Sequence, residues 1–171
     1  MAAHYSQPKG FVGRNICYAI TFCGTYYGAT VGGSSTLHLV GRDGFFGIVK
    51  SEKRAILRSI VNNIFFHIER RAGSYPIHNM TSSVLRMFRQ CVAADWFEKY
   101  GDPVIGFETL VELPRTGEAY RRDGWTEVGI TEGNTCKRVS GKGRRRTDSW
   151  TGQRVWDTKN LRPKRVFVRH K

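Results

Sequence analysis

The chain has 171 residues, of which 40% are hydrophobic and 25% are charged, a composition that suits one globular domain with its own core. It contains no run of about 18 apolar residues and does not begin with a charged segment followed by an apolar one, so neither a membrane-spanning helix nor a secretion signal is expected. We therefore expect a cytoplasmic protein with no membrane partner.

The formal net charge of +14 is concentrated near the C-terminus. From Lys137 onward, 13 Lys and Arg residues stand against two Asp residues, so this segment carries a net charge of +11. We expect a catalytic domain over residues 1–136 and a basic extension over residues 137–171. Basic groups that contact phosphates release counterions, so such an extension predicts salt-sensitive binding to nucleic acid. A solvated, disordered tail is the alternative interpretation of a charge run.

Aromatic residues in the basic extension favour nucleic-acid binding over a role in solubility alone. Trp150 and Trp156 lie among the arginines, and a segment that only solubilises the protein has no need of indoles. Residues 165–169 alternate like a strand that packs on the body of the protein. The side chains expected to contact DNA are Arg144, Arg145, Arg146, Trp150, Arg154, Lys164 and Arg165.

The first part of the chain predicts short β-strands. Residues 16–23 are apolar on both faces, which is typical of an interior strand, and residues 26–31 follow as its hairpin partner. The glycines at positions 32 and 33 are expected to end this hairpin. Two further short strands are expected at residues 37–40 and 45–50.

The clearest helix is expected over residues 81–100, with Asn79 or Thr81 as its cap and a glycine at its end. Before it, residues 51–61 are ambiguous between helix and strand, and residues 63–70 have the composition of a strand. The core face of the long helix is predicted from apolar residues at three- and four-residue spacing, namely Val84, Leu85, Met87, Phe88, Cys91, Val92 and Trp96.

The most informative part of the chain predicts a strand over residues 104–113, a helix over residues 116–123 and a second strand after it. Glu108 and Glu112 lie in the first strand, and their even separation places both carboxylates on one face. Tyr120 on the helix can fold back toward the end of that strand. A carboxylate and a phenol at such a junction are groups typical of a catalytic site.

The four cysteines form no C-x-x-C pair and lie in apolar or mixed stretches. We expect reduced, mostly buried thiols at Cys17, Cys23, Cys91 and Cys136 rather than a zinc site or disulfides.

The order of polar and glycine residues in the strand–helix–strand region resembles the Mom-type DNA-modification enzymes of phages. The matching residues are Glu112, Gly117, Ala119, Tyr120, Gly124-Trp125 and Gly129-Ile130-Thr131. The same pattern is similar to the A component of the Druantia anti-phage system. Three more segments match on the Mom side, namely His4-Tyr5-Ser6, Glu69-Arg70 and residues 79–83, so that the resemblance covers about residues 4–133.

Mom-type enzymes are assigned to the GNAT-like acyltransferase fold, and the predicted order of strands and helices agrees with that fold. The resemblance therefore implies a single-domain α/β protein with a mixed central sheet flanked by helices. In this fold the donor's phosphates bind at the N-terminus of the long helix. Asn79, Ser82 and Arg71 are expected to bind the donor. Residues 73–83 replace the glycine-rich loop of ordinary acetyltransferases, so conventional acetyl-CoA binding is not implied. The expected donor is an activated acyl group, either acetyl-CoA or another one.

The resemblance implies catalytic roles for Glu112, Tyr120, Arg70 and Ser83. A carboxylate at position 112 would accept a proton from a poor nucleophile, and the phenol would stabilise the developing oxyanion. By the residues alone, a solvated glutamate, a half-buried aromatic and a helix-capping serine are the ordinary interpretations.

Mom-type enzymes have been associated with iron as well as with an acyl donor. His4 is the candidate ligand, together with a carboxylate. His38, His67 and His78 lie in apolar or loop contexts, where a hydrogen-bonded structural histidine is the common outcome.

By resemblance, we expect an enzyme that transfers a carbamoylmethyl-like group to adenine N6 in double-stranded phage DNA and so protects that DNA from restriction. The target base would have to leave the stack. Two other interpretations stay open: a non-catalytic DNA-binding module of a defence or transposition system, and an RNA or protein acyltransferase. The oligomeric state is also open, a dimer included.

Overall fold

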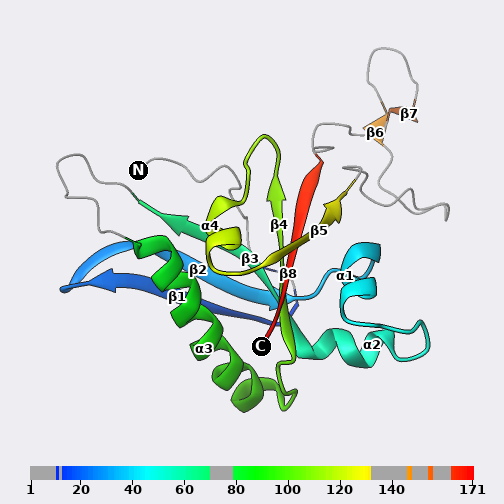
Figure 1. The fold of residues 1–171 in the computed structure, drawn as a ribbon, viewed down its shortest axis with the longest axis horizontal. Coiled ribbons are helices and arrows are strands. Elements are labelled where there is room, and N and C mark those ends of the chain that lie inside the picture. Colours follow the sequence, from blue (N-terminus) through cyan, green and yellow to red (C-terminus); the bar gives the residue numbers. More distant parts are fainter. Residues whose placement is uncertain (1–10, 12, 70–78, 132–145, 148–153, 156–162) are drawn as a thin grey trace.

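The protein is described by a computed structural model covering residues 11, 13–69, 79–131, 146–147, 154–155 and 163–171. A six-stranded sheet has the order β1-β2-β3-β4-β8-β5 (Figure 1). Its strands are β1 (Asn15–Phe22), β2 (Thr25–Ser34), β3 (Ile60–Ile68), β4 (Gly106–Glu112), β5 (Thr126–Ile130) and β8 (Lys164–His170). The sheet is mixed, because β3 and β4 are parallel and the other neighbouring strands are antiparallel.

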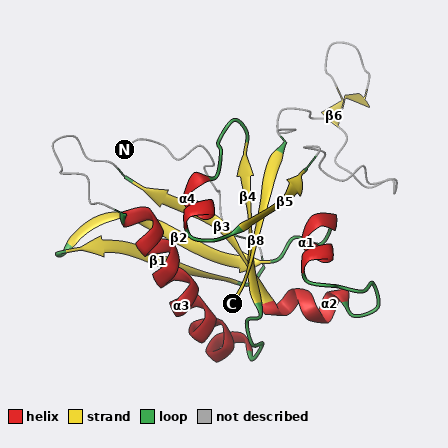
Figure 2. Ribbon diagram, viewed as in Figure 1, coloured by secondary structure: helices red, strands yellow, loops and turns green. Residues whose placement is uncertain are grey.

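Helices lie on both faces of the sheet (Figure 2). They are α1 (Val40–Phe45), α2 (Lys53–Ile56), α3 (Met80–Tyr100) and α4 (Glu118–Arg122), with a 3-10 turn η1 (Leu57–Ser59). The larger core joins α3 and α4 to one face, through residues such as Phe88, Trp96, Phe107 and Phe167. A smaller core around Val166 and Val168 joins the region of α1 to the other face. The expected mixed sheet flanked by helices is confirmed.

The long helix α3 is confirmed at nearly the expected bounds. Leu85, Phe88, Val92 and Trp96 are buried, whereas Met87 is 61% exposed and does not belong to the core face. The helix ends at Gly101, whose φ of +74° is the left-handed conformation that favours glycine. At the other end, Asn79 occupies the N-cap position, but its side chain makes no capping hydrogen bond.

The structure corrects several expectations for the first part of the chain. β1 is an edge strand and not an interior one, and Cys17, Ala19 and Thr21 along one of its faces are exposed. Neither of the short strands expected at residues 37–40 and 45–50 forms, and residues 40–45 form α1. Residues 53–59 are helical, and β3 starts at Ile60. Short apolar runs of this kind fit either a strand or a buried helix turn, and tertiary contacts decide between them.

The glycines at positions 32 and 33 continue β2 where the sequence predicted a break. A Cβ on Gly32 would lie 2.9 Å from Cγ2 of Val92 on α3, and one on Gly33 would lie 2.6 Å from Cδ1 of Ile64. The two glycines are therefore sites of close approach, at which the helix and the neighbouring strand need the space of the missing side chains.

The end of the basic segment lies inside the sheet. β8 pairs with β4 on one side and β5 on the other, and Val166, Phe167 and Val168 are buried. Residues 165–169 thus form the strand that their alternation predicted. A boundary at residue 136 does not separate β8 from the body of the protein. Upstream of β8, the two-residue strands β6 (Arg146–Thr147) and β7 (Arg154–Val155) pair with each other.

Two further observations concern membrane-spanning helices and the exposure of the cysteines. Among the described residues, no helix is long and apolar enough to cross a membrane. Cys17, Cys23 and Cys91 are free thiols, but they are exposed, so the expectation of mostly buried cysteines is wrong for these three. Cys136 lies outside the described residues.

A buried ion pair links α1 to strand β4 of the sheet. The side chains of Arg42 on α1 and Glu108 on β4 are both fully buried and in direct contact. The N–H of Thr36 donates to Glu108 Oε1 at 2.6 Å, and Arg42 Nη2 donates to the carbonyl of Thr36 at 2.7 Å. Burial raises the pKa of Glu108, and Arg42 opposes that rise. No local pattern in the sequence indicates that Glu108 has an arginine partner on a distant segment.

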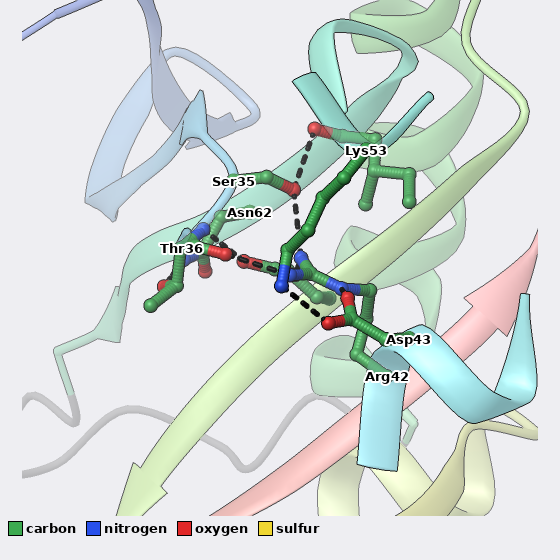
Figure 3. A network of polar contacts seen from close by, with 8 residues as sticks. Ser35, Thr36, Arg42, Asp43, Lys53 and Asn62 are labelled. Carbon is green, nitrogen blue, oxygen red and sulfur yellow. Dashed lines mark hydrogen bonds and ion pairs between the residues drawn. The ribbon is translucent and has the colours of Figure 1, made fainter. Parts of the chain in front are cut away.

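The network extends from Arg42 to the surface through Asp43 and Lys53 (Figure 3). Burial acts to raise the pKa of Asp43, but hydrogen bonds from Lys53 and Arg42 outweigh this effect and hold the pKa below its ordinary value of 3.8. The stabilisation from Asp43 is therefore present above that value and is lost as pH falls through the lower pKa of the folded state.

Asp43→Asn should consequently make the free energy of unfolding depend less on pH in the acid range. In urea titrations between about pH 2 and pH 6, the wild-type free energy of unfolding should fall more steeply below about pH 4 than that of the variant. Equal slopes for the two proteins would contradict this role of Asp43.

Candidate functional site

The candidate site is a fork between the parallel strands β3 and β4. These strands pair at Ile60–Gly106, Val61–Phe107 and Asn62–Glu108 and at no later position, although both continue for several residues. Figure 1 shows the two ribbons diverging. A cavity of about 810 Å³ lies in the fork. Its walls come from β3, β4, the segment over residues 114–120 and Thr81 in the first turn of α3.

The cavity combines apolar walls with a few polar groups, as small-molecule sites usually do. The apolar part includes Ile64, Phe65, Phe66, Ile68, Leu110, Val111, Pro114 and Ala119. The polar or titratable part includes Asn63, His67, Thr81, Thr109, Arg115, Glu118 and Tyr120. The cavity can therefore hold a partly apolar ligand and supply proton acceptors to it.

Tyr120 lines the cavity from α4 and is held from several sides. Its ring stacks on Phe167 at a centroid distance of 5.9 Å and meets the edge of Trp125 at 5.2 Å. Its hydroxyl donates to Oδ1 of Asn63 at 2.7 Å. Only 8% of the residue is exposed. The phenol predicted as a site residue thus sits in the fork in a fixed orientation.

Gly117 positions the start of α4, and its replacement should be costly. The residue has a φ of +73°, and a Cβ there would lie 2.3 Å from Cε2 of Phe167. Gly117→Ala should lower the free energy of unfolding by about 1–3 kcal/mol through backbone strain and overlap with that ring. Urea unfolding measures the change, and Gly44→Ala, where a Cβ would meet nothing within 4 Å, is the matched control.

Glu112 does not share this cavity in the structure. It is not among the described residues that line the fork. Strand alternation places it on the face of Leu110, which packs against the smaller core and also lines the fork, whereas Val111 and Tyr120 belong to the larger core. Its cross-strand neighbour is Lys164 on β8. The shared face expected for Glu108 and Glu112 follows from the same alternation, but the expected pairing of Glu112 with Tyr120 at one groove is not found.

The residues expected to bind the donor lie near the first turn of α3. Thr81 lines the cavity, and Ser82 and Ser83 follow it in the same turn. The N–H of Ser83 donates to the carbonyl of Asn79 at 3.0 Å, which is the ordinary helical bond. Arg70 and Arg71 lie outside the described residues.

The expected DNA contacts are only partly described. Arg165 donates to Oε1 of Glu127 at 2.6 Å, and this ion pair engages its guanidinium inside the protein. The N–H of Lys164 donates to Thr131 at 3.1 Å. Arg144, Arg145 and Trp150 lie outside the described residues, and Arg146 and Arg154 are placed by their backbone alone, in β6 and β7.

Several polar cavity residues were not assigned a site role from the sequence, among them the titratable residues His67, Arg115 and Glu118. His67 was interpreted as a structural histidine. It lies near the end of β3, just before the Glu69-Arg70 pair of the resemblance. That position was the one feature of the sequence that pointed to a site role for His67. Arg115 and Glu118 flank the loop that carries Gly117, and only the fold of that loop brings them to the fork.

The described residues do not fit an iron site. No group of three or more His, Cys, Asp or Glu side chains gathers anywhere in the described part of the chain. His4, the expected ligand, lies outside that part.

Comparison with known proteins establishes the fold but not a family. No protein-family profile and no curated protein matches the chain. Among solved structures, the chain is similar to FeeM, an N-acyl amino acid synthase from uncultured soil microbes, with a TM-score of 0.50 and 10% identity over 91% of this chain and 72% of FeeM. At this identity the likeness establishes the fold, so the protein has the GNAT-like acyltransferase fold that the sequence predicted.

A second solved structure is more distant. It is the C-terminal condensation domain of Ebony in complex with beta-alanyl-dopamine, with a TM-score of 0.39, 12% identity and coverage of 86% of this chain and 68% of that one. We draw nothing from it.

Proposed function

We propose that the protein is an acyltransferase that binds an activated acyl donor in the fork between β3 and β4. The observation that supports this proposal is the divergence of two parallel strands after three residue pairs, which opens a cavity that reaches the first turn of α3. The fold likeness to FeeM, described as an N-acyl amino acid synthase, supports the same reaction class.

The fork suits an extended donor with amide groups. β3 and β4 are not paired with each other beyond Asn62 and Glu108, and an extended donor would lie along the gap between the two strands. At the α3 end of the cavity, backbone N–H groups of the first helical turn and the helix dipole favour the negative charge of a donor phosphate.

The acceptor would be an amine, and the cavity offers groups to take its proton. As the amine nitrogen bonds to the donor, the bond to the leaving group breaks and the nitrogen loses a proton. His67 and Glu118 are titratable groups on the cavity wall. We assign the proton to His67, because it lines the cavity and an imidazole nitrogen can accept a proton.

The proposed acceptor is adenine N6 in DNA, whose nitrogen forms an amide with the acyl group as the donor's leaving group departs. The support is the order of residues shared with Mom-type enzymes, from Glu112 to Thr131, and the +11 charge of residues 137–171. Phosphate contacts by that segment would offset the few kcal/mol needed to extrude the base.

Nucleoside mass spectrometry tests the proposal. Plasmid DNA from cells that produce the protein should contain a deoxyadenosine of increased mass, and DNA from cells that produce Tyr120→Phe should contain much less of it. Unmodified DNA together with acylated tRNA or protein would reject adenine as the acceptor while keeping acyl transfer. Unmodified DNA, RNA and protein would reject acyl transfer itself.

A further inference from the structure

A second cavity, outside the fork, lies between α3 and the segment that leads into β4. Its volume is about 510 Å³, which is in the range of small-ligand sites. The cavity is lined mainly by apolar residues, and Ala93, Val104 and Phe107 form a buried floor. Lys171, which follows β8, lines it as well. The cavity can therefore hold a flat apolar group next to a cation.

Phe97 on α3 is an exposed aromatic wall of this cavity. The residue is 57% exposed. Ala93 and Ala94 precede it by one helical turn and also line the cavity, so their small side chains leave space beside the ring. Gln90 on the same stripe of the helix carries a carboxamide that can both donate and accept hydrogen bonds. This surface suits the stacking of a second ring, such as a nucleobase.

The carboxylate at the α4 end of the cavity is already engaged. Arg89, which lines the cavity, donates from Nε and Nη2 to the two carboxylate oxygens of Asp123 at 2.9 Å and 3.0 Å. Nε1 of Trp125 donates to the same carboxylate at 2.9 Å. Asp123 thus has partners for both of its oxygens and neutralises one guanidinium.

Arg169 on β8 is a second guanidinium beside this ion pair. It is in register with Phe107, and a Cβ on Gly124 would lie 2.5 Å from its Nη1. Burial and the nearby Arg89 lower the pKa of Arg169, and Asp123 opposes them. Within the described part of the chain, Arg169 donates no hydrogen bond. A half-buried guanidinium in this situation is suited to bind an anion, and its planar fork matches phosphate.

We propose that this cavity binds one nucleotide of a single-stranded nucleic acid, with the base stacked on Phe97 and a neighbouring phosphate on Arg169. The net charge of +14 favours a polyanionic partner. The inference rests on the proposed function only in taking DNA as the partner, and it adds a contact outside the fork. Thr81 at the fork and Phe97 are about 24 Å apart along the axis of α3, so one strand can reach both.

The first test measures the base contact by fluorescence anisotropy of a labelled oligothymidylate of about ten nucleotides. Phe97→Ala should weaken binding by about 5-fold or more, the effect of losing one stacked base. Phe22→Ala removes a side chain that is similarly exposed, at 53%, but lies on β1, and it should leave the affinity unchanged. Wild-type affinity in Phe97→Ala, or no binding by the wild-type protein, would overturn the proposal.

The second test measures the phosphate contact through the salt dependence of the same binding. Arg169→Gln should weaken binding and reduce the slope of log K against log salt by about 0.7, whereas Phe97→Ala should keep the wild-type slope. Lys99→Gln is the charge-matched control, because Lys99 is an exposed cation of α3 that donates to the carbonyl of Asn15. A wild-type slope in Arg169→Gln would overturn the phosphate contact.

The results distinguish this inference from the proposed function. Modified DNA in cells, together with unchanged oligonucleotide binding by both variants, would sink this inference alone. Weakened binding by both variants without any modified DNA would sink the proposed function alone. Calorimetric binding of laurate that Phe97→Ala abolishes, without any binding of oligothymidylate, would assign the cavity to an amphiphilic carboxylate and overturn the nucleotide as its occupant.

Discussion

Replacing Arg42 by methionine should lower the free energy of unfolding by about 3–5 kcal/mol, the largest stability effect expected for this protein. The substitution leaves the Glu108 carboxylate fully buried with no guanidinium beside it, and it also leaves the Thr36 carbonyl without its donor. Stability falls because a buried charge without its partner keeps the full cost of leaving water. Urea unfolding followed by circular dichroism measures the loss.

The double variant Arg42→Met, Glu108→Leu is the control that separates the charge from the shape of the site. It removes both charges, so it should recover most of the stability lost in Arg42→Met. Arg122→Ala breaks an exposed pair with Glu118, whose side chains are 71% and 54% exposed, and should change stability by less than about 1 kcal/mol. A double variant as unstable as the single one would mean that the fold needs the shape of Arg42 rather than its charge.

Replacing His67 by glutamine should lower the rate of adduct formation by about 100-fold or more, the effect typical of losing a proton acceptor in a transfer reaction. Glutamine keeps the size and polarity of the side chain but cannot take up a proton at neutral pH. The measurement is the amount of modified deoxyadenosine formed over time on plasmid DNA by purified protein supplied with an acyl donor.

Two variants act as controls for this experiment. His38 lines a separate cavity beside β5, so His38→Gln should keep the wild-type rate. Glu112→Gln should also keep it, because Glu112 lies on the face of β4 opposite to Tyr120. If Glu112→Gln abolished the reaction and His67→Gln did not, the carboxylate expected from the sequence would be the base and our assignment would be wrong.

Much of the fold could be predicted because strong local patterns agree with the tertiary structure. The seven-residue apolar face of α3 and its terminal glycine predicted the helix within one residue, although Met87 and Cys91 of that face are exposed. The alternation of residues 165–169 gave β8, and Gly124, with a φ of +77°, ends α4 as expected. In each case the periodicity or the glycine is a property of the chain itself.

The site was less predictable, because faces and partners are decided by contacts between distant segments. Alternation along β4 correctly places Glu108 and Glu112 on one face of the sheet, but it does not show on which face the fork lies. Tyr120 reaches the cavity as predicted, whereas its partner Asn63 lies 57 residues earlier in the sequence. The Arg42–Glu108 pair spans 66 residues and left no local pattern.

By itself, the sequence determined the long helix, the strand–helix–strand order that carries Tyr120, the GNAT-like fold class and the basic segment, because composition and periodicity are local. Only the tertiary structure decided that β3 and β4 separate after three pairs, that Glu112 and Tyr120 lie on opposite faces, and that β8 closes the gap between β4 and β5. The physical reason is that the order of strands in a sheet and the partners of buried polar groups are set by long-range packing and desolvation, which no local pattern encodes.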